Sequence, residues 1–563
     1  MNVQKMTGSH YTSSKLSQYM ANILFKYMKE DIKNIDEVNI LDPSCGEGDL
    51  LNAVANKFDK NNLNLLGVDI NEEALKTAKN NIFNNQKMKL TAIKNNYIDL
   101  IIDLEENKKN DTKKIRNIDA IIANPPYVRT QNLDGNELKK WKDFFNLTGR
   151  VDLYHVFLAA MTQNLKEGDL ICVITSNRYL NTSGGKSIRE LLFENYDILE
   201  VIDLGDTKLF EAAVLPAIFV GRKKKIEDKS GNIPSFIKIY EKAKHDNQFD
   251  YEAENIFNIL EAEKSGVYKI KNTEKYYVLT KGKLLIPKKY NDYWIMASDK
   301  DIKWSEQLEK NSEFIFEDLF QIKVGVKTTA DKVFIKKDWK ELPEEIRPES
   351  DLIKSLITSK SIKNWKINEE NNLQVLYPHE NKNEKRIAVN LEKYPRANNY
   401  LNQHYTTLSS RKYLSKANRK WYEIWVPHNP ADWKKIKIVF PDISSSAQFS
   451  IDTKGNLVNG NCYWIIPKKE INNDWLYLAA GVANSEVMKR YHSIKFQNVL
   501  YSDKKRYLTQ YVNNYLLPDI ESNYSKKIIY YMKKITDSNY NEKYFLEIKN
   551  EIDYLTKKAF GMD

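Results

Sequence analysis

The fold of this chain is decided by residues 38–48, which read VNILDPSCGEG. The first four of these residues predict a short buried strand, and the others form a turn that contains Gly46 and Gly48. Glycine adopts φ values that are closed to other residues and lets a backbone approach a ligand closely. Apolar residues then recur with helical spacing at 50–58. A strand, a glycine turn and a helix in this order predict an α/β domain.

The alternation of strands and helices continues on both sides of this stretch. Helical spacing of apolar residues predicts helices at residues 13–29, 71–80, 153–165 and 187–193. Short apolar runs predict strands at residues 65–69, 89–93, 118–123, 170–175, 198–203 and 217–221. Such alternation predicts a mostly parallel sheet that is covered by helices on both faces. Ligands bind these sheets at the carboxyl ends of the strands, where the polar turns of this sequence fall.

A domain boundary is expected after this alternation ends, because residues 222–250 are polar and rich in lysine. The first 250 residues hold 35 basic and 35 acidic residues, whereas residues 351–500 hold 23 basic and 13 acidic residues. A neutral front half and a basic back half are typical of a catalytic domain joined to one that binds a polyanion. Ordinary lysine-rich surface is the alternative explanation for this charge.

Composition excludes several other classes of protein. The 563 residues are 42% hydrophobic and 12% aromatic, which is enough to form cores and excludes disorder as the main state. The three widely spaced cysteines exclude a disulfide scaffold, and the seven histidines show no zinc-ligand spacing, so no metal is expected. No run approaches 18 apolar residues and no signal peptide is visible, so we expect a cytoplasmic protein without a membrane partner.

Acidic side chains follow two of the predicted strands. The turn after Asp42 has neither the GxGxxG pattern nor the Lys-Ser/Thr pair of phosphate-binding loops. A carboxylate there suits a cationic or hydrogen-bond-donating ligand. Asp69 ends the next strand, at the position where an acidic side chain accepts hydrogen bonds from ribose hydroxyl groups. Structural turns and caps are the alternative explanation for this pair.

A more specific signal is the run Asn124-Pro125-Pro126-Tyr127, which follows the strand predicted at 118–123. Two consecutive prolines fix φ and offer carbonyl groups without competing N–H donors. The Asn124 side chain adds a second acceptor. Together they form a rigid pair of acceptors for a planar NH2 group, and the Tyr127 ring can stack on a flat heterocycle.

With these residues the sequence resembles the DNA amino-methyltransferases, and among them the adenine-N6 enzymes of the gamma arrangement. The resemblance is close over the first 225 residues. Residues 7–12 resemble the family's N-terminal motif, residues 42–48 its cofactor loop and residues 124–127 its catalytic motif, and residues 152–154 and 204–206 also recur in the family. The resemblance implies a Rossmann-like S-adenosylmethionine-dependent methyltransferase domain at 1–230, a connecting region at 231–310 and an α+β DNA target-recognition domain at 311–563.

The resemblance also implies a role for each matching residue. Asn124, Pro125, Pro126 and Tyr127 are expected to be catalytic, and Tyr127 and Phe210 are expected to stack on the target base. The residues expected to bind S-adenosylmethionine are Tyr11, Thr12, Asp42, Ser44, Gly46, Gly48, Asp69, Ile70, Asn96, Tyr97 and Asn124. Asn96 departs from the family pattern, in which an Asp holds the cofactor's adenine amino group; the Asn oxygen accepts the same hydrogen bond without a charge.

The back half resembles the family's target-recognition region more loosely, in residues 324–334, 353–363 and 504–518. Basic pairs that alternate with aromatic residues also suit contacts to phosphates and stacking on bases. The residues expected to bind DNA are Arg411, Lys412, Arg419, Lys420, Lys434, Lys435, Lys504 and Arg506.

These features predict a sequence-specific DNA adenine-N6 methyltransferase that flips its target adenine out of double-stranded DNA. We expect a bacterial-type, nucleoid-associated enzyme that acts as a monomer on DNA, either as an orphan epigenetic methylase or beside a separate restriction endonuclease.

Three alternatives were weighed against this function. A protein-glutamine N5-methyltransferase shares the Asn-Pro-Pro-Tyr motif, but it has no place for a basic region of more than 300 residues. A fused restriction–modification enzyme carries a nuclease domain before its N-terminal motif, and here only six residues precede Thr7. A DNA-binding protein with an inactive cofactor fold is disfavoured because the catalytic positions are intact.

Overall fold

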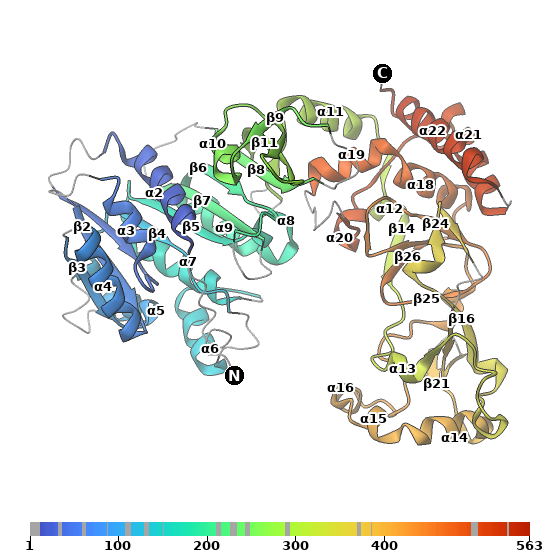
Figure 1. Cartoon of the computed structure of the whole chain (residues 1–563). Helices are drawn as coiled ribbons and strands as arrows, with labels where there is room; N and C mark the ends of the chain where they lie inside the picture. The colour runs from blue at the N-terminus through green and yellow to red at the C-terminus, as the bar shows by residue number, and fades with distance from the viewer. Residues whose placement is uncertain are drawn as a thin grey trace. The chain divides into compact units, whose positions relative to one another are not determined.

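The computed structural model describes residues 12–31, 37–58, 63–86, 88–106, 114–128, 134–149, 151–209, 215–225, 233–242, 248–287, 293–368, 373–383, 385–496, 505–537 and 540–562. The chain divides into two compact units (Figure 1). The first unit consists of Met1–Ile302 with short pieces near residue 500, and the second consists of the other residues after Ile302. Among the described residues, no helix has the length and hydropathy needed to cross a membrane.

One sheet of twelve described strands organises the first unit, in the order β3-β2-β1-β4-β5-β7-β6-β8-β11-β10-β9, with β12 paired to β11. Strands β1 to β5 are mutually parallel, and β7 is antiparallel to both of its neighbours. The bounds are β1 Val38–Asp42, β2 Leu63–Asp69, β3 Leu90–Lys94, β4 Ala120–Ala123, β5 Leu170–Ser176, β6 Tyr196–Asp203, β7 Pro216–Lys223, β8 Ser235–Glu241, β9 Tyr251–Ala253, β10 Gly266–Ile270, β11 Tyr276–Leu285 and β12 Ile295–Met296.

Helices cover both faces of this sheet, as Figure 1 shows. One face packs against α2 (Ser14–Met28), α3 (Asp49–Ala55), α4 (Glu72–Gln86) and α10 (Ile256–Glu261). The other packs against α5 (Tyr97–Glu105), α6 (Gly135–Phe144), α7 (Leu153–Asn164), α8 (Arg178–Asn181) and α9 (Lys186–Asn195). Neighbouring strand residues enter opposite cores: Ile40 lies in the first and Leu41 in the second. Both faces therefore need apolar residues, and for this reason the strands read as continuous apolar runs.

The predicted α/β class with a mostly parallel sheet is confirmed, but the first unit extends further than the sequence suggests. Residues 231–310, expected as a connecting region, contribute β8 to β12. Strand β8 pairs in parallel with β6, and β11 pairs with β8. The lysine-rich stretch near residue 230 thus separates two strands of one sheet, so its polarity marks a connection inside the unit.

The second unit combines small, mostly antiparallel sheets with helices, in agreement with the expected α+β class; only β16 and β25 among its described strands pair in parallel. Two four-stranded sheets have the orders β14-β26-β22-β24 and β15-β19-β16-β25. Their bounds are β14 Phe320–Val324, β26 Cys462–Pro467, β22 Lys437–Pro441, β24 Ser450–Asp452, β15 Ile335–Lys336, β19 Leu373–Leu376, β16 Ile353–Ile357 and β25 Leu457–Val458. Strand pairs are β13 (Phe314–Ile315) with β28 (Leu516–Leu517), β17 (Ile362–Lys363) with β18 (Lys366–Ile367), β20 (His379–Lys382) with β21 (Lys385–Ala388), and β23 (Ile443–Ser444) with β27 (Lys505–Arg506).

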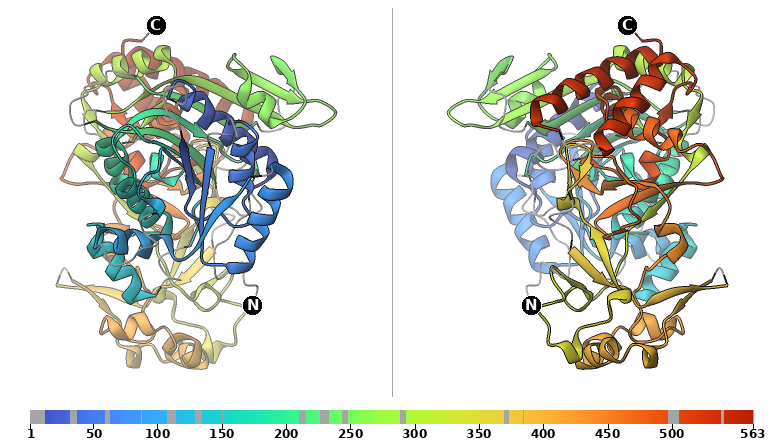
Figure 2. Two further views of the ribbon diagram at one scale, coloured as in Figure 1. Left: turned by 90° about the vertical axis from the view of Figure 1, so that its left-hand side faces the viewer. Right: turned by 90° about the vertical axis from the view of Figure 1, so that its right-hand side faces the viewer.

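The helices of this unit pack around the sheets, and the C-terminal pair α21 and α22 lie side by side (Figure 2). Their bounds, including α11 at the boundary between the units, are α11 Asp299–Lys310, α12 Phe316–Leu319, α13 Asp331–Phe334, α14 Pro395–Gln403, α15 Tyr405–Ser409, α16 Lys412–Lys416, α17 Pro430–Trp433, α18 Asp474–Asn484, α19 Glu486–Lys495, α20 Thr509–Val512, α21 Asn523–Asp537 and α22 Glu542–Ala559.

Candidate functional site

Three strand ends of the first unit bring the main predicted site residues together. The strand order reverses between β1 and β4, and such a reversal opens a crevice at the carboxyl ends of the strands. Ser44 lies between the two strands: its N–H donates to Asp42 Oδ1 at 3.0 Å, and its hydroxyl donates to the Asn124 carbonyl at 3.3 Å. The turn after β1 is therefore bonded to the Asn-Pro-Pro-Tyr segment after β4.

The second acidic residue is tied to the same turn. The N–H of Gly46 donates to Asp69 Oδ2 at 2.9 Å, and the N–H of Asn71 donates to Asp69 Oδ1 at 2.8 Å. Each carboxylate oxygen has a further lone pair, so the Asp69 side chain keeps the capacity to accept from a ligand hydroxyl. The neighbouring residue Ile70 is 62% exposed.

Gly48 shows why this turn requires glycine. Its φ is +86°, and a Cβ atom added there would lie 3.0 Å from the Cβ of Ala78 in α4. The left-handed backbone and the close approach of α4 each disfavour a side chain. Gly48 therefore lets α4 pack against the turn. Its role is more to shape the crevice than to contact a ligand.

The Asp42 carboxyl is buried at the end of β1, and burial raises its pKa to about 8, with Asp69 as a further, smaller cause. The hydrogen bond from Ser44 acts in the opposite direction but does not offset the burial. A buried acid of this kind gains its charge when a cation or several donors arrive beside it. Asp42 is thus suited to a positively charged ligand.

The catalytic candidates after β4 are held rigidly. The Asn124 amide nitrogen donates to the Thr12 hydroxyl at 3.0 Å, which fixes the orientation of the amide group. The Tyr127 hydroxyl donates to the Ile174 carbonyl in β5 at 3.2 Å. Burial raises the pKa of the Tyr127 phenol well above its ordinary value, so the ring is neutral. The segment therefore offers fixed acceptors and a fixed, uncharged ring.

A buried polar network beside this site was not predicted from the sequence. Asp203 ends β6, and its carboxylate accepts from Asn177 Nδ2 at 2.9 Å, from the Tyr240 hydroxyl at 2.8 Å and from the Gly205 N–H at 3.1 Å. The network joins the carboxyl ends of β5, β6 and β8. An acidic residue at the end of a third parallel strand was the signal that could have revealed it, since Asp42 and Asp69 occupy the equivalent positions.

One predicted cofactor contact is not supported by the structure. The Tyr97 side chain is buried, its hydroxyl donates to Asn164 Oδ1 in α7 at 2.9 Å, and its ring stacks on Phe157. It belongs to the core on the α5 and α7 side of the sheet. Asn96 caps α5, because its side-chain oxygen accepts from the Ile98 N–H at 3.0 Å. Tyr11 and Phe210 lie outside the described residues.

The described residues predicted to bind DNA in the second unit fall into three groups. Lys412, Lys420 and Lys434 are exposed. By contrast, Arg411 is buried and donates to backbone carbonyls, so the structure does not support a phosphate contact for it. Further partners occupy the remaining described members: Arg419 pairs with Glu423 at 3.0 Å, Lys435 with Asp432 at 2.9 Å, and Arg506 with Asp442 at 2.7 Å. Lys504 lies outside the described residues.

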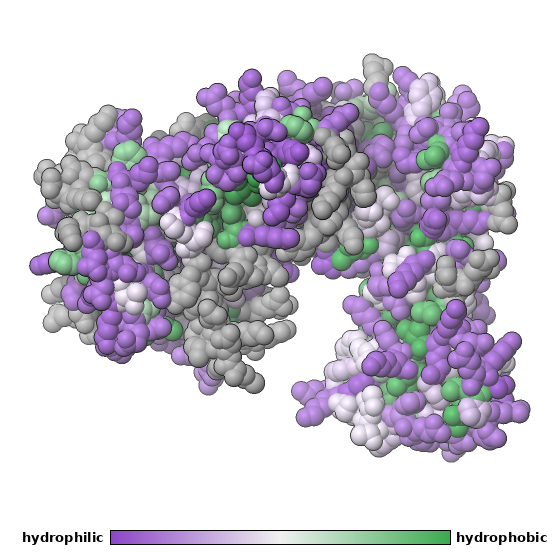
Figure 3. All heavy atoms as spheres, viewed as in Figure 1, coloured by the Kyte–Doolittle hydropathy of each residue, from purple (hydrophilic) through white to green (hydrophobic). Residues whose placement is uncertain are grey.

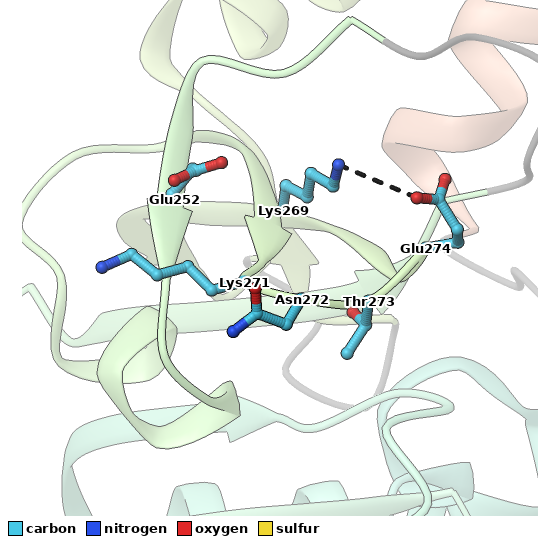
Figure 4. Close-up of a pocket in the computed structure, with 6 residues that line it drawn as sticks. All are labelled: Glu252, Lys269, Lys271, Asn272, Thr273 and Glu274. Carbon is cyan, nitrogen blue, oxygen red and sulfur yellow. Dashed lines mark ion pairs between the residues drawn. The ribbon is translucent and has the colours of Figure 1, made fainter.

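Two other features of the described residues bear on ligand binding. A cavity of about 490 Å³ lies on the hairpin between β10 and β11, and Figure 4 shows Lys269 and Lys271 on its wall. Lys269 pairs with Glu274 at 3.8 Å and Lys271 with Glu254 at 2.6 Å, so these charges are already compensated. In the part of the chain that the structure describes, no group of three His, Cys, Asp or Glu side chains is placed to hold a metal ion.

Comparisons with known proteins agree with the division of the chain into two units. A family model described as Eco57I restriction-modification methylase matches residues 63–210, and one described as TaqI-like C-terminal specificity domain matches residues 355–517. The type II methyltransferase M.BanIII of Aneurinibacillus aneurinilyticus is 45% identical, with all of this chain and 98% of the relative covered. The type II methyltransferase M.BstVI of Geobacillus stearothermophilus is 24% identical, with 92% and 91% covered.

Among solved structures, a nuclease-deletion mutant of the Type ISP restriction-modification enzyme LlaGI, in complex with a DNA substrate mimic, has a TM-score of 0.51 at 12% identity. The match covers 94% of this chain and 54% of the LlaGI chain, and it supports the fold alone. The 45% identity over both full lengths carries the assignment. The chain therefore belongs to the type II DNA methyltransferases of restriction–modification systems, with a methylase domain followed by a specificity domain.

Proposed function

We propose that this protein transfers a methyl group from S-adenosylmethionine to the N6 amino group of adenine in double-stranded DNA. The observation that carries the proposal is the Asn124-Pro125-Pro126-Tyr127 segment, whose Asn amide is oriented by Thr12 and whose Tyr ring is tied to β5. Acceptors fixed in this way suit an NH2 group on a flat ring. The adjoining crevice carries the acidic residues that suit the cofactor.

The described residues fit S-adenosylmethionine by their chemistry. Asp42 suits its positive charge, the Asp69 carboxylate suits its ribose hydroxyls, and the exposed Ile70 side chain suits the face of its adenine ring. The backbone at Gly46 and Gly48 takes left-handed φ values, which lets the turn curve around a ligand. When bound, the cofactor supplies an electrophilic methyl group on a sulfonium.

The protein's own contribution is to raise the nucleophilicity of the target amine. The lone pair of an adenine N6 is delocalised into its ring, so the amine is a weak nucleophile. Asn124 Oδ1 and the Pro125 carbonyl would accept hydrogen bonds from its two N–H groups. This favours a more tetrahedral nitrogen and stabilises the positive charge that develops there. The Tyr127 ring would stack on the extruded base, and stacking of this kind is worth about 1–3 kcal/mol.

The second unit favours DNA over a protein glutamine as the substrate. A glutamine side chain also presents a planar NH2 group, so the Asn124 segment alone does not separate the two. The match of residues 355–517 to a specificity domain, and the excess of basic residues at 351–500, both suit a polyanionic substrate.

The proposal is tested by expressing the protein in a host that lacks DNA methylation. Sequencing of the genomic DNA with modification detection should reveal N6-methyladenine at one short motif, and mass spectrometry of the nucleosides should find the same base. An Asn124→Ala strain is the matched control and should show far less of the modified base. N4-methylcytosine in place of N6-methyladenine would contradict the assignment of the base, and unmodified DNA from an active, soluble protein would contradict the substrate.

The raised pKa of Asp42 predicts that cofactor binding releases a proton. Because the cation of the cofactor favours the charged carboxylate, the pKa of Asp42 should be lower in the complex than its value of about 8 in the free protein. Affinity should therefore increase as the pH rises from 6 to 8 and fall as the pH decreases. Titration calorimetry at pH 7 in two buffers of different ionisation enthalpy measures the proton directly.

Asp42→Asn is the control, since it has the same shape and no proton to release. The variant should bind the cofactor more weakly. Its binding enthalpy should differ less between the two buffers than that of the parent, because the proton of Asp42 is absent. Equal proton release in the parent and in Asp42→Asn would assign the proton to another group.

A further inference from the structure

A strained turn lies on the surface of the second unit, between β14 and α13. Thr329 has a φ of +58°. A β-branched side chain is a genuine outlier in this left-handed region. The Lys327 and Thr329 side chains are exposed, whereas Thr328 between them is buried. Strain of this kind persists only where the surroundings enforce it, and it collects at functional sites.

Arg411 is one of the groups that enforce this conformation. One guanidinium nitrogen, Nη1, donates to the Thr328 carbonyl at 3.0 Å and to the Thr329 hydroxyl at 3.4 Å. The other groups of the fork donate to the Leu408 carbonyl at 3.0 Å and to the Trp421 carbonyl at 2.6 Å. A buried, planar cation thus joins the turn to two segments that lie about 80 and 90 residues later in the chain.

Neighbouring backbone contacts hold both sides of the turn. Lys327 and Val426 exchange two backbone hydrogen bonds, at 3.2 and 3.1 Å. A Cβ atom on Gly325 would lie 2.0 Å from the Asn459 carbonyl oxygen, so the chain approaches Asn459 too closely for any side chain. The Thr328 hydroxyl donates to Asp331 and accepts from the Ala330 N–H. The backbone that carries Lys327 and Thr329 is therefore fixed, and both residues are exposed. The Thr329 hydroxyl donates to the Thr328 carbonyl and accepts from Arg411 Nη1, so one lone pair of its oxygen remains for a ligand.

Aromatic and basic side chains surround the turn in the chain segments bonded to it. Trp425, beside Val426, is 37% exposed, and Tyr405 is 52% exposed and packs on Trp421. Exposed lysines come from the short helix α16 and the residues around it: Lys412, Lys416 and Lys420. In Figure 3 the surface over α15 and α16 mixes pale spheres of intermediate hydropathy with purple hydrophilic ones. Lysines interleaved with aromatic rings suit a nucleic acid.

We propose that Lys327 and Thr329 contact base edges of the DNA and take part in choosing the recognised sequence, while Lys412, Lys416 and Lys420 contact phosphates. The proposal rests on the function proposed above. A phosphate is recognised by charge and tolerates mobile lysines, but hydrogen bonds to base edges are directional and need donors at fixed positions. A strained turn with buried anchors fixes the backbone from which Lys327 and Thr329 extend, and so limits the positions that their side chains can reach. Lysine donates to the O6 and N7 atoms of guanine, and the Thr329 oxygen, whose proton is donated to Thr328, can accept from the amino group of adenine or cytosine.

The first test compares the recognised motif of variants in the full-length protein. Lys327→Ala and Thr329→Ala should each accept a second base at one or two positions of the motif, with discrimination reduced roughly 5- to 150-fold there. Modification sequencing of genomic DNA reports the motif base by base. Lower methylation at every site with an unchanged motif would overturn the proposal, because it would make both residues plain backbone contacts.

The second test separates function from structural strain. Thr329→Gly keeps the left-handed turn but removes the side chain, so the melting temperature should stay or rise while the motif still relaxes. Arg411→Lys keeps the charge but loses the planar fork, so Arg411, as a positioning residue, should also relax the motif. Variants that only melt earlier, with the parent's motif, would return the turn and Arg411 to a purely structural role.

The third test addresses the lysines. The double variant Lys412→Ala/Lys420→Ala should reduce the slope of log K against log salt by about two units and leave the motif unchanged. The matched control is Lys527→Ala/Lys543→Ala, which removes two exposed lysines of α21 and α22 and should leave the slope unchanged. Equal slopes for both double variants would overturn the assignment of this surface to phosphates. The base methylated by the parent tests the proposed function separately, since motif and salt slope are read whichever base is modified.

Discussion

Replacing Asn124 by alanine should slow methyl transfer by about 100- to 1,000-fold, the usual consequence of losing one fixed hydrogen-bonding group at a centre that gains charge in the transition state. Cofactor affinity should change little, because the turn after β1 keeps its bonds to Asp42 and Asp69. Single-turnover assays with tritiated cofactor at saturating DNA measure the rate of transfer, and calorimetry measures the affinity.

Thr12 offers a graded control for this prediction. Its hydroxyl accepts from the Asn124 amide nitrogen at 3.0 Å and so orients the amide. Thr12→Ser keeps that acceptor and should transfer at nearly the parent rate, whereas Thr12→Val removes it and should give an intermediate rate. If Asn124→Ala transferred as fast as the parent, the amide would have no part in polarising the amine.

Local patterns predict the first unit as far as β7, but not β8 to β12, which lie in the stretch expected as a connecting region. Buried strands such as β1 and β4 need apolar residues on both faces, so they stand out from their polar turns in the sequence. The same logic places Asp42, Asp69 and Asn124 at neighbouring strand ends, where the structure finds them bonded through Ser44 and Gly46. Because the carboxyl ends of parallel strands lie at one edge of the sheet, residues that are distant in the sequence meet there in one site.

The sequence does not predict in which direction individual side chains point. Tyr97 is itself expected from the sequence to contact the cofactor, but helix α5 begins there and its ring lies in the core. Arg411 and Arg419 look like surface charges in the sequence, yet both donate to backbone carbonyls. The Thr328 carbonyl reached by Arg411 lies 83 residues earlier in the chain, whereas the carbonyls reached by Arg419 lie within six residues of it. The second unit is built from strands as short as two residues, and several of them, such as β13 with β28 and β23 with β27, pair with segments far away in the chain and leave no periodic signal.

A second large effect is expected at a buried ion pair of the second unit. Lys437 and Asp452 face each other across β22 and β24, with 2.6 Å between Nζ and Oδ2 and side-chain exposures of 0% and 2%. Asp452→Ala should lower the free energy of unfolding of this unit by about 3–5 kcal/mol, because it leaves a buried ammonium without its counter-ion. Urea titration with saturating cofactor, which stabilises the first unit, isolates the transition of the second.

The pH dependence of Asp452→Ala identifies the cause of this loss. Burial already lowers the pKa of Lys437, and the removal of Asp452 should lower it further. Between this lowered pKa and the ordinary lysine pKa of about 10.4, the unfolded state binds the proton more tightly than the folded state. The stability of the variant should therefore rise as the pH increases from 7 to 10.

Adding Lys437→Met removes the buried charge, so the double variant should be more stable than Asp452→Ala alone and lose this pH dependence. The residual loss then measures the turn at Asn456, whose N–H and side-chain amide both donate to Asp452 at 2.9 Å. A double variant no more stable than Asp452→Ala would show that this turn, and not the ion pair, accounts for the effect.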